Sequence, residues 1–359
     1  MNVLFITRKF PPTKGGMEKV AYELYKHLSE ITNVKLIKWA GSNKWLPLVL
    51  PYFLFKSWWV LLLKKIDIIY LQDGLLAPLG LASKIFRKPV AITIHGLDIT
   101  YKNRFYQFLI PKCISKMDKI ICISQATKQE CAKRGITKGK ITVIPDGVSD
   151  EFYMGEDKNK LREKLSRKLR LNLKNKKIIL SVGRLVKRKG FHWFIENVLP
   201  RIVKKRNEII YLIGGDGPLR GEIENSIKKV KMNKYVKLLG EVGEETLKLL
   251  YNSSDVFVMP NIPVESDMEG FGIVVLEAAS CGVPVVASRL EGIKDAIKNG
   301  ENGFLIEPCD ADSFANMISR LLKNDYKRKK AGGGARESTL KNYSWEKISE
   351  RYLKEFKKR

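Results

Sequence analysis

The chain has few cysteines and histidines, which argues against a zinc site and a disulfide framework. Only three histidines occur among the 359 residues, and no two cysteines form a CxxC pair; the five are Cys113, Cys122, Cys131, Cys281 and Cys309. Zinc sites need such ligands clustered at short spacings. An odd cysteine count fits a reducing cytoplasm better than secretion. Asp310 and Asp312 resemble a metal-binding pair, but they follow a proline and precede a helical pattern, which predicts a helix N-cap.

Acidic residues are also scarce relative to basic ones. The sequence has 38 Asp and Glu against 66 Lys and Arg, a formal net charge of +28. Such an excess favours an anionic partner: nucleic acid, an acidic membrane surface or a phosphorylated small molecule. The basic residues are dispersed, and no zinc-finger or RNA-binding signature accompanies them. We therefore expect no nucleic-acid partner.

Only one apolar run is long. Leu46–Leu63 contains 18 residues with a single charge, Lys56. The length is marginal for a membrane span, and two prolines interrupt its first third. Two interpretations remain open: a helix in a membrane surface, with Trp58 and Trp59 at the interface, or a core helix without lipid contact. The apolar stretch at the N-terminus is too short for a signal peptide and predicts a first buried strand.

Short apolar runs alternate with helical patterns through most of the sequence. This alternation predicts an α/β protein with two doubly wound, Rossmann-like parallel sheets. The predicted parts are an N-terminal domain over 1–155, a polar linker helix over 156–176, a C-terminal domain over 177–340 and a final helix over 341–359.

Polar residues follow several of the predicted strands, where ligands of open α/β sheets gather. His95 ends one strand and precedes a glycine, which favours a functional role over the structural role of most lone histidines. Arg184 and Lys189 flank a turn, an arrangement that suits two phosphates. Gly15 and Gly16 precede a helix and allow backbone amides to approach a ligand.

The segment 263–288 contains two carboxylates, Glu269 and Glu277, around a predicted helix that starts at Ile273. Eight helical residues rotate by about 800°, close to two turns, so both carboxylates are predicted to point to one side. Carboxylates accept hydrogen bonds from sugar hydroxyls, and the glycines before the helix leave its N–H groups open to an anion. In the alternative interpretation, Glu269 caps the helix and Glu277 forms a buried ion pair.

Together these residues resemble the retaining family 4 (group 1) glycosyltransferases of GT-B fold, in which two Rossmann-like domains face each other across a cleft. The resemblance rests on an ordered set of motifs: Gly15-Gly16 with Glu18, His95-Gly96-x-Asp98, Ile144-Pro145-x-Gly147-Val148, Gly183-Arg184 with Lys189-Gly190, Gly214-x-x-Gly217-Pro218 and Glu269-x₇-Glu277. The stretch 264–272 is most similar to GDP-mannose-dependent mannosyltransferases that act on lipid-linked acceptors. Asp146 departs from the pattern, because Asn is common there, and so does the Trp-rich segment 46–63.

The resemblance implies transfer of a hexose, with mannose from GDP-mannose as the first expectation, to a glycan or lipid-linked acceptor in cell-envelope glycan synthesis. The N-terminal domain would bind the acceptor and the C-terminal domain the nucleotide sugar, while the final helix would cross back to the first domain. The expected location is cytoplasmic, with peripheral attachment to an anionic membrane surface. A UDP-sugar-dependent glucosyl, galactosyl or N-acetylglucosaminyl transferase and a catalytically silent nucleotide-sugar-binding protein are the alternatives.

The same resemblance implies roles for individual residues. No metal and no cofactor are expected beyond the GDP- or UDP-linked substrate, and no acceptor residues are assigned. The catalytic set is His95, Arg184, Lys189 and Glu269. The donor-binding set is Gly15, Gly16, Gly183, Arg184, Lys189, Val242, Glu269, Gly270, Phe271, Gly272, Ile273 and Glu277.

Overall fold

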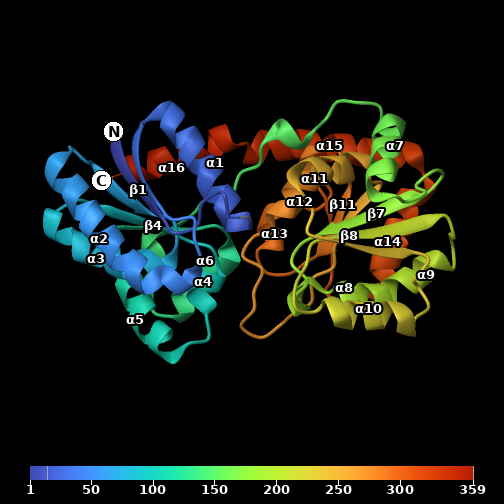
Figure 1. The fold of residues 1–359 in the computed structure, drawn as a ribbon, viewed down its shortest axis with the longest axis horizontal. Coiled ribbons are helices and arrows are strands. Elements are labelled where there is room, and N and C mark those ends of the chain that lie inside the picture. The colour runs from blue at the N-terminus through green and yellow to red at the C-terminus, as the bar shows by residue number, and fades with distance from the viewer. Residues whose placement is uncertain (14, 359) are drawn as a thin grey trace. The chain divides into compact units, whose positions relative to one another are not determined.

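The computed structural model describes residues 1–13 and 15–358, which form two compact units (Figure 1). The first unit comprises Met1–Gly147, Ser266–Phe271 and Trp345–Arg359, and the second comprises Val148–Glu265 and Gly272–Ser344. Each unit contains one six-stranded sheet in which every strand pair is parallel. The predicted α/β class with two parallel sheets is therefore confirmed.

The sheet of the first unit has the order β2-β1-β3-β4-β5-β6. Its strands are β1 (Asn2–Thr7), β2 (Asn33–Lys38), β3 (Ile68–Leu71), β4 (Val90–Ile94), β5 (Lys119–Cys122) and β6 (Ile141–Val143). The inner strands are apolar runs because helices cover both faces of a parallel sheet. The strand order reverses between β1 and β3, so their carboxyl ends flank the switch point at which such folds bind ligands.

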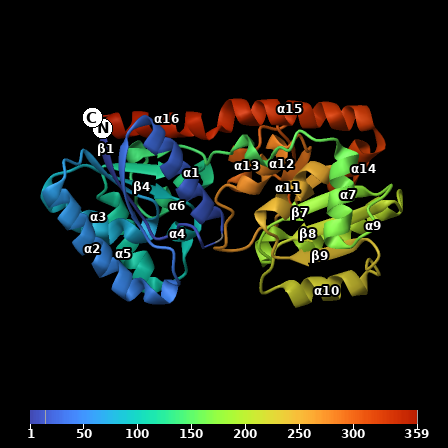
Figure 2. The ribbon, with the colours of Figure 1, turned by 45° about the horizontal axis from the view of Figure 1, so that its top comes forward.

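Helices cover both faces of this first sheet (Figures 1 and 2). On one face α1 (Gly16–Ile31) packs against α16 (Trp345–Lys357). On the other face α2, α3 and α5 follow one another; the helices on this side are α2 (Leu46–Leu63), α3 (Ala77–Ser83), α4 (Leu97–Thr100), α5 (Arg104–Ser115) and α6 (Gln125–Lys133).

The last helix, α16, completes the core of the first unit. Trp345 is buried, and a Cβ built at Gly147 would lie 2.5 Å from its ring. Further along, the Tyr352 hydroxyl lies 3.3 Å from Thr93 Oγ1 of β4, and the ring of Tyr352 meets that of Tyr70 of β3 edge-on at 5.8 Å. The end of the chain therefore packs directly on the central strands of the first sheet.

The sheet of the second unit has the order β12-β11-β10-β7-β8-β9. Its strands are β7 (Lys177–Val182), β8 (Ile209–Gly214), β9 (Val236–Gly240), β10 (Val256–Met259), β11 (Val285–Ser288) and β12 (Phe304–Ile306). Counted within the unit from the β9 edge, this is the order 3-2-1-4-5-6 of dinucleotide-binding folds. The switch point lies between β7 and β10.

Helices also cover both faces of the second sheet (Figure 2). One face carries α8 (Phe191–Trp193), a π-helical turn (Phe194–Val198), α9 (Leu199–Val203), α10 (Arg220–Lys229) and α14 (Ala311–Lys323). The other face carries α7 (Lys158–Leu169), α11 (Glu244–Ser253), α12 (Ile273–Ser280), α13 (Ile293–Ala296) and α15 (Asp325–Tyr343). The predicted N-cap is confirmed, because Asp310 accepts a hydrogen bond from Ser313 N at 3.0 Å at the start of α14.

The helix within the predicted polar linker, α7, is attached to the second unit by an ion cluster. Arg162 Nη2 lies 2.5 Å from Asp255 Oδ2, and Lys158 and Arg328 each place a nitrogen 3.3 Å from Oδ1. Asp255 is only 1% exposed. Burial alone would raise the pKa of Asp255, but these cations and the N–H of Ile178 lower it below its usual value. Lys158 and Arg162 of the predicted polar linker helix therefore pair with a buried carboxylate of the second unit.

Candidate functional site

The loops after β7 and β8 pack backbone against backbone at the carboxyl edge of the second sheet. Gly183 N donates to Gly214 O at 2.9 Å, and Leu185 N donates to Asp216 O at 3.0 Å. A Cβ built at Gly215 would lie 2.1 Å from Gly183 O. Only glycine permits this approach, which explains why glycines follow both strands.

Two predicted cations, Arg184 and Lys189, lie on the loop after β7. Arg184 is exposed, whereas Lys189 is only 6% exposed and extends back toward Gly183, where an added Cβ would lie 3.3 Å from Lys189 Cε. Gly190 follows with φ +65°, and a Cβ there would lie 2.0 Å from Pro260 O. Close packing of Gly190 thus fixes the backbone that presents Lys189. Two cations beside a switch point suit an anionic ligand.

The helix α12 begins beside the end of β10. Gly272 has φ +87°, and a Cβ there would lie 3.0 Å from Met259 Cε. Ile273 is the first helical residue, as predicted. Val242 follows β9 and lies 3.4 Å from the Cβ position of Gly214. The second sheet therefore brings Gly183, Arg184, Lys189, Val242, Gly272 and Ile273 to the carboxyl edge of four neighbouring strands.

Glu277 lies farther along α12 and is 4% exposed. Its Oε2 accepts a hydrogen bond from the Tyr251 hydroxyl at 2.8 Å. Burial, and then the nearby Glu277 carboxylate, raise the pKa of Tyr251 well above its usual value. The phenol therefore stays protonated, and its hydroxyl orients the Glu277 carboxylate by donating a hydrogen bond to it. Sequence reasoning missed this tyrosine, because it precedes Glu277 by 26 residues and no local pattern connects the two.

Glu269 lies before α12, so the helical relation to Glu277 does not extend over all eight residues. The helix begins only at Ile273, and the left-handed backbone of Gly272 interrupts any helical path from Glu269. In addition, the segment Ser266–Phe271 packs with the first unit, whereas Glu277 belongs to the second. Their separation of eight residues therefore does not place the two carboxylates on one helix face.

His95 follows β4 in the first unit and is held by two hydrogen-bond partners. Its Nε2 lies 2.8 Å from Gln72 O, and because a carbonyl only accepts, Nε2 bears the proton. Asp98 Oδ1 accepts from the backbone N of His95 and of Gly96, each at 2.8 Å, and Oδ2 accepts from Gly74 N at 3.0 Å. Burial raises the pKa of Asp98, and the charge of His95, followed by the N–H groups of Gly74 and His95, offsets only part of the rise. Asp98 thus fixes the turn that presents the imidazole.

The segment Ser266–Phe271 lies against this histidine turn. A Cβ at Gly270 would lie 2.0 Å from His95 O, and one at Gly96 would lie 3.1 Å from the Cα of Gly270. Glu269 is 8% exposed and Phe271 is 2% exposed. The structure thus groups Glu269, Gly270 and Phe271 with His95 in the first unit.

An ion pair joins the carboxyl ends of β1 and β3. Arg8 Nε lies 3.0 Å from Asp73 Oδ1, at the switch point of the first sheet. Burial alone would lower the pKa of Arg8, but the Asp73 carboxylate outweighs it and the pKa is raised. Both residues were missed, although they follow buried strands as His95 does. That signal, applied to every strand, would have found them.

The predicted glycines before α1 have different surroundings. A Cβ at Gly15 would lie 2.3 Å from Glu18 Oε2, whereas no atom of the described residues lies within 4 Å of one at Gly16, the first residue of α1. Glu18 is 7% exposed, and its Oε1 lies 3.2 Å from Lys9 Nζ. Gly15 therefore makes room for a carboxylate of the chain itself.

Asp146 occupies a buried position after β6 and is 6% exposed. Burial raises its pKa to about 6, and the charge of His95 offsets only part of the rise. Like Arg8 and Asp73, Asp146 is thus a titratable group of the first unit to which the strand-end pattern assigned no role.

Comparisons with known proteins cover both units. The family model described as glycosyl transferases group 1 matches residues 162–338, and the one described as glycosyltransferase family 4 matches residues 14–152. The chain is 30% identical over 305 residues to an uncharacterized glycosyltransferase of Methanocaldococcus jannaschii, covering 82% of this chain and 75% of the relative. It is 25% identical over 370 residues to a GDP-mannose-dependent alpha-(1-6)-phosphatidylinositol monomannoside mannosyltransferase of Mycolicibacterium smegmatis, covering 96% and 95%.

A solved structure with the same fold is that of Anabaena HepE in complex with UDP and glucose. The two chains superpose with a TM-score of 0.77 at 20% sequence identity, over 99% of this chain and 98% of the other. The two six-stranded parallel sheets with their covering helices match the GT-B fold.

Proposed function

Because this chain belongs to the group 1 glycosyltransferases, we propose that it is a retaining hexosyltransferase that transfers mannose from GDP-mannose to a glycan or lipid-linked acceptor. The observation that supports this most directly is the pair Arg184 and Lys189 at the switch point of the second sheet. The mannosyltransferase relative, similar over nearly the whole chain, favours GDP-mannose. The UDP and glucose bound by HepE favour a UDP-sugar as the alternative donor.

The chemistry requires stabilisation of a departing diphosphate. Glycosyl transfer builds positive charge at the anomeric carbon and negative charge on the leaving group. Arg184, Lys189 and the N–H groups at the start of α12 would stabilise the negative charge electrostatically. In this proposal the acceptor attacks the front face of an oxocarbenium-like species, and the donor phosphate takes its proton. This scheme differs from that of glycosidases, in which two carboxylates flank the glycosidic bond that is cleaved.

The carboxylates and the histidine would hold the sugar nucleotide. Glu277, oriented by the Tyr251 hydroxyl, would accept from ribose hydroxyls. Glu269 and the amides that follow it would hold hydroxyls of the transferred sugar. His95 donates from Nε2 to Gln72 O, so its Nδ1 is the nitrogen through which a neutral ring would accept a hydroxyl hydrogen bond.

The first test is donor binding by calorimetry with GDP-mannose, UDP-glucose, UDP-N-acetylglucosamine and UDP-galactose, followed by transfer assays with the donor that binds. We expect Arg184→Ala and Lys189→Ala each to lower kcat by about 10²–10³-fold. Lys187→Ala is the matched control, because Lys187 is an exposed cation of the same loop. Folded Arg184 and Lys189 variants that transfer at the full rate would contradict the assignment. Donor binding with neither transfer nor donor hydrolysis would favour a silent binding protein.

Tyr251→Phe tests the role of Glu277 separately. The substitution removes a hydrogen bond to a carboxylate, worth about 1.5–3 kcal/mol, so we expect the KM for donor to rise about tenfold or more with a smaller change in kcat. Tyr211→Phe is the control, because the buried Tyr211 hydroxyl bonds Ser181 at 2.8 Å instead. Equal KM changes in both variants would show that Tyr251 acts only on stability.

A further inference from the structure

One face of α2 is apolar and exposed. The residues Trp45, Leu48, Tyr52, Phe55, Trp59 and Leu62, here called the α2 stripe, are each at least 50% exposed. They are spaced three or four residues apart, so they follow a single side of the helix. Among the described residues, 15 of the 17 exposed large hydrophobic side chains belong to the first unit, and the second unit has only Tyr153 and Tyr326. Exposed large hydrophobic side chains are therefore concentrated on the first unit, and the stripe accounts for six of its fifteen.

The opposite face of α2 fixes this orientation. Val49, Phe53, Ser57 and Leu61 are buried at intervals of four residues, and the three apolar ones join the core beneath the helix. The helix is long and apolar enough to cross a membrane by length and composition, with a mean hydropathy of 1.6, yet only 22% of it is buried. A core helix would be mostly buried, so the predicted core alternative does not describe α2 within its unit.

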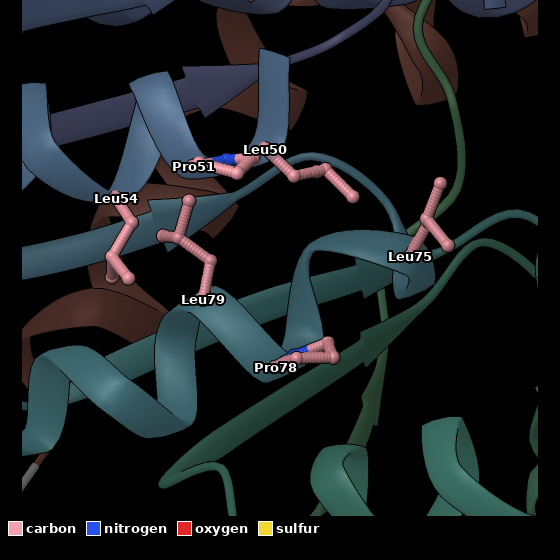
Figure 3. Close-up of a pocket in the computed structure, with 6 residues that line it drawn as sticks. All are labelled: Leu50, Pro51, Leu54, Leu75, Pro78 and Leu79. Atoms are coloured by element: carbon pink, nitrogen blue, oxygen red, sulfur yellow. The ribbon is translucent and has the colours of Figure 1, made fainter. Parts of the chain in front are cut away.

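An apolar groove adjoins the stripe between α2 and α3 (Figure 3). Its volume is about 270 Å³, and its lining is Leu50, Pro51 and Leu54 from α2 with Leu75, Pro78 and Leu79 from the segment that follows β3. Pro51 precedes Phe55 by four residues and so borders the stripe. At the other side, Leu75 N donates to Asp73 Oδ1 at 3.0 Å. The groove thus extends from the stripe to the loop that contains Asp73.

The segment of the chain that contains the stripe is rich in positive charge. Residues 44–116 include eleven lysines and arginines against three aspartates, of which Asp73 and Asp98 are buried and Asp67 is half-buried. One of the eleven, Lys84, pairs with Asp118 just beyond this segment at 2.9 Å. Lys56 lies at the edge of the stripe, where its Nζ is 3.1 Å from the Tyr52 hydroxyl. A lysine that extends along an aromatic side chain with its ammonium outward has the arrangement of interfacial anchors. The net positive charge is complementary to anionic lipid headgroups.

We propose that α2 docks on an anionic phospholipid bilayer, with the α2 stripe among the acyl chains and the groove occupied by one hydrocarbon chain. A span across the bilayer is disfavoured, because it would remove Phe53 and Leu61 from the core and place Lys56 in mid-membrane. In an interfacial position, the buried face of α2 stays packed on the core while the stripe contacts the acyl chains. One part of this inference rests on the proposed function. If the protein transfers a sugar to a lipid-linked acceptor, a hydrocarbon chain of that lipid in the groove would bring the acceptor next to the loop that contains Asp73.

The experiment mixes the full chain with vesicles of phosphatidylglycerol or of phosphatidylcholine, without nucleotide sugar. We expect co-sedimentation with phosphatidylglycerol at low salt, and quenching of tryptophan fluorescence when its acyl chains are brominated. Phe55→Glu with Trp59→Glu should weaken vesicle binding at least tenfold. Tyr326→Glu, at a 74% exposed position of the second unit, should leave it unchanged.

Three results would overturn docking: no binding to either vesicle, equal binding by the stripe variant, or a self-association of the chain that the stripe variant abolishes. Binding without quenching by brominated chains would show adsorption by charge alone and refute insertion. Leu54→Trp tests the groove, because an indole placed there should be quenched by brominated chains. If it is not quenched, no chain enters the groove. All these readouts are independent of transfer, so failure here and failure of the proposed function are distinguishable.

Discussion

Replacing Asp146 by asparagine should stabilise the first unit at neutral pH. The pKa of this buried carboxyl is raised from 3.8 to about 6. The folded state therefore binds the proton more tightly than the unfolded state. This tighter proton binding stabilises the folded state fully below about pH 4, and the stabilisation is lost as pH rises through 6. Two pKa units correspond to about 3 kcal/mol, which is the cost of the ionised side chain at pH 8. Asparagine has nearly the same shape and no charge, so this cost should disappear.

The measurement is amide hydrogen exchange of peptides from β4 and β6 at pH 5 and pH 8, corrected for intrinsic exchange. We expect the Asp146→Asn variant to be more protected than the parent at pH 8, with a difference that shrinks toward pH 4. Asp312→Asn is the control, because its exposed carboxylate pairs with Arg201 at the surface, where such pairs contribute little. A variant less protected at pH 8 would refute the reasoning and show that the ionised carboxylate makes bonds the fold requires.

Two further substitutions test the second unit by thermal and urea unfolding. Gly190→Ala should destabilise the second unit by at least about 2 kcal/mol, because φ is +65° and the new methyl would lie 2.0 Å from Pro260 O. Gly221→Ala is the control. This residue lies in open space on α10, so the substitution should be neutral or stabilise the unit by up to about 1 kcal/mol. Equal effects would show that the loop after Lys189 relaxes freely. Asp255→Asn should cost about 3–5 kcal/mol, because Lys158, Arg162 and the buried Arg328 would lose the carboxylate they share, and among the described residues only Arg328 would keep another, Asp325. A loss below about 1 kcal/mol would contradict this account of the cluster.

Much of the fold could be predicted because parallel strands covered on both sides must be continuous apolar runs. The same logic placed His95 and Lys189 after such runs, at the carboxyl edge of their sheets. What escaped prediction depends on contacts between residues distant in sequence. The bond between Tyr251 and Glu277 is one example, and the attachment of α7 to Asp255 is another. Neither contact produces a periodic pattern in the sequence, so the sequence could not distinguish these buried charged residues from solvated ones.

The nature of α2 was ambiguous for a different reason. Its composition fits a core helix, an interfacial helix and a membrane span, because hydropathy counts apolar residues without regard to what covers them. Only the packing of Phe53 on one side and the exposure of Phe55 on the other distinguish these possibilities.

The position of α16 has a consequence for the order of folding during synthesis. Trp345 and Tyr352 complete the core around Gly147 and Tyr70, yet they follow the whole second unit in the chain. Domains usually fold in order from the N-terminus as they emerge. Here the first unit cannot close its core until the whole second unit has been translated. Until then the side of the first sheet that α16 covers stays exposed, so deletion of α16 would damage the core of the unit that is translated first.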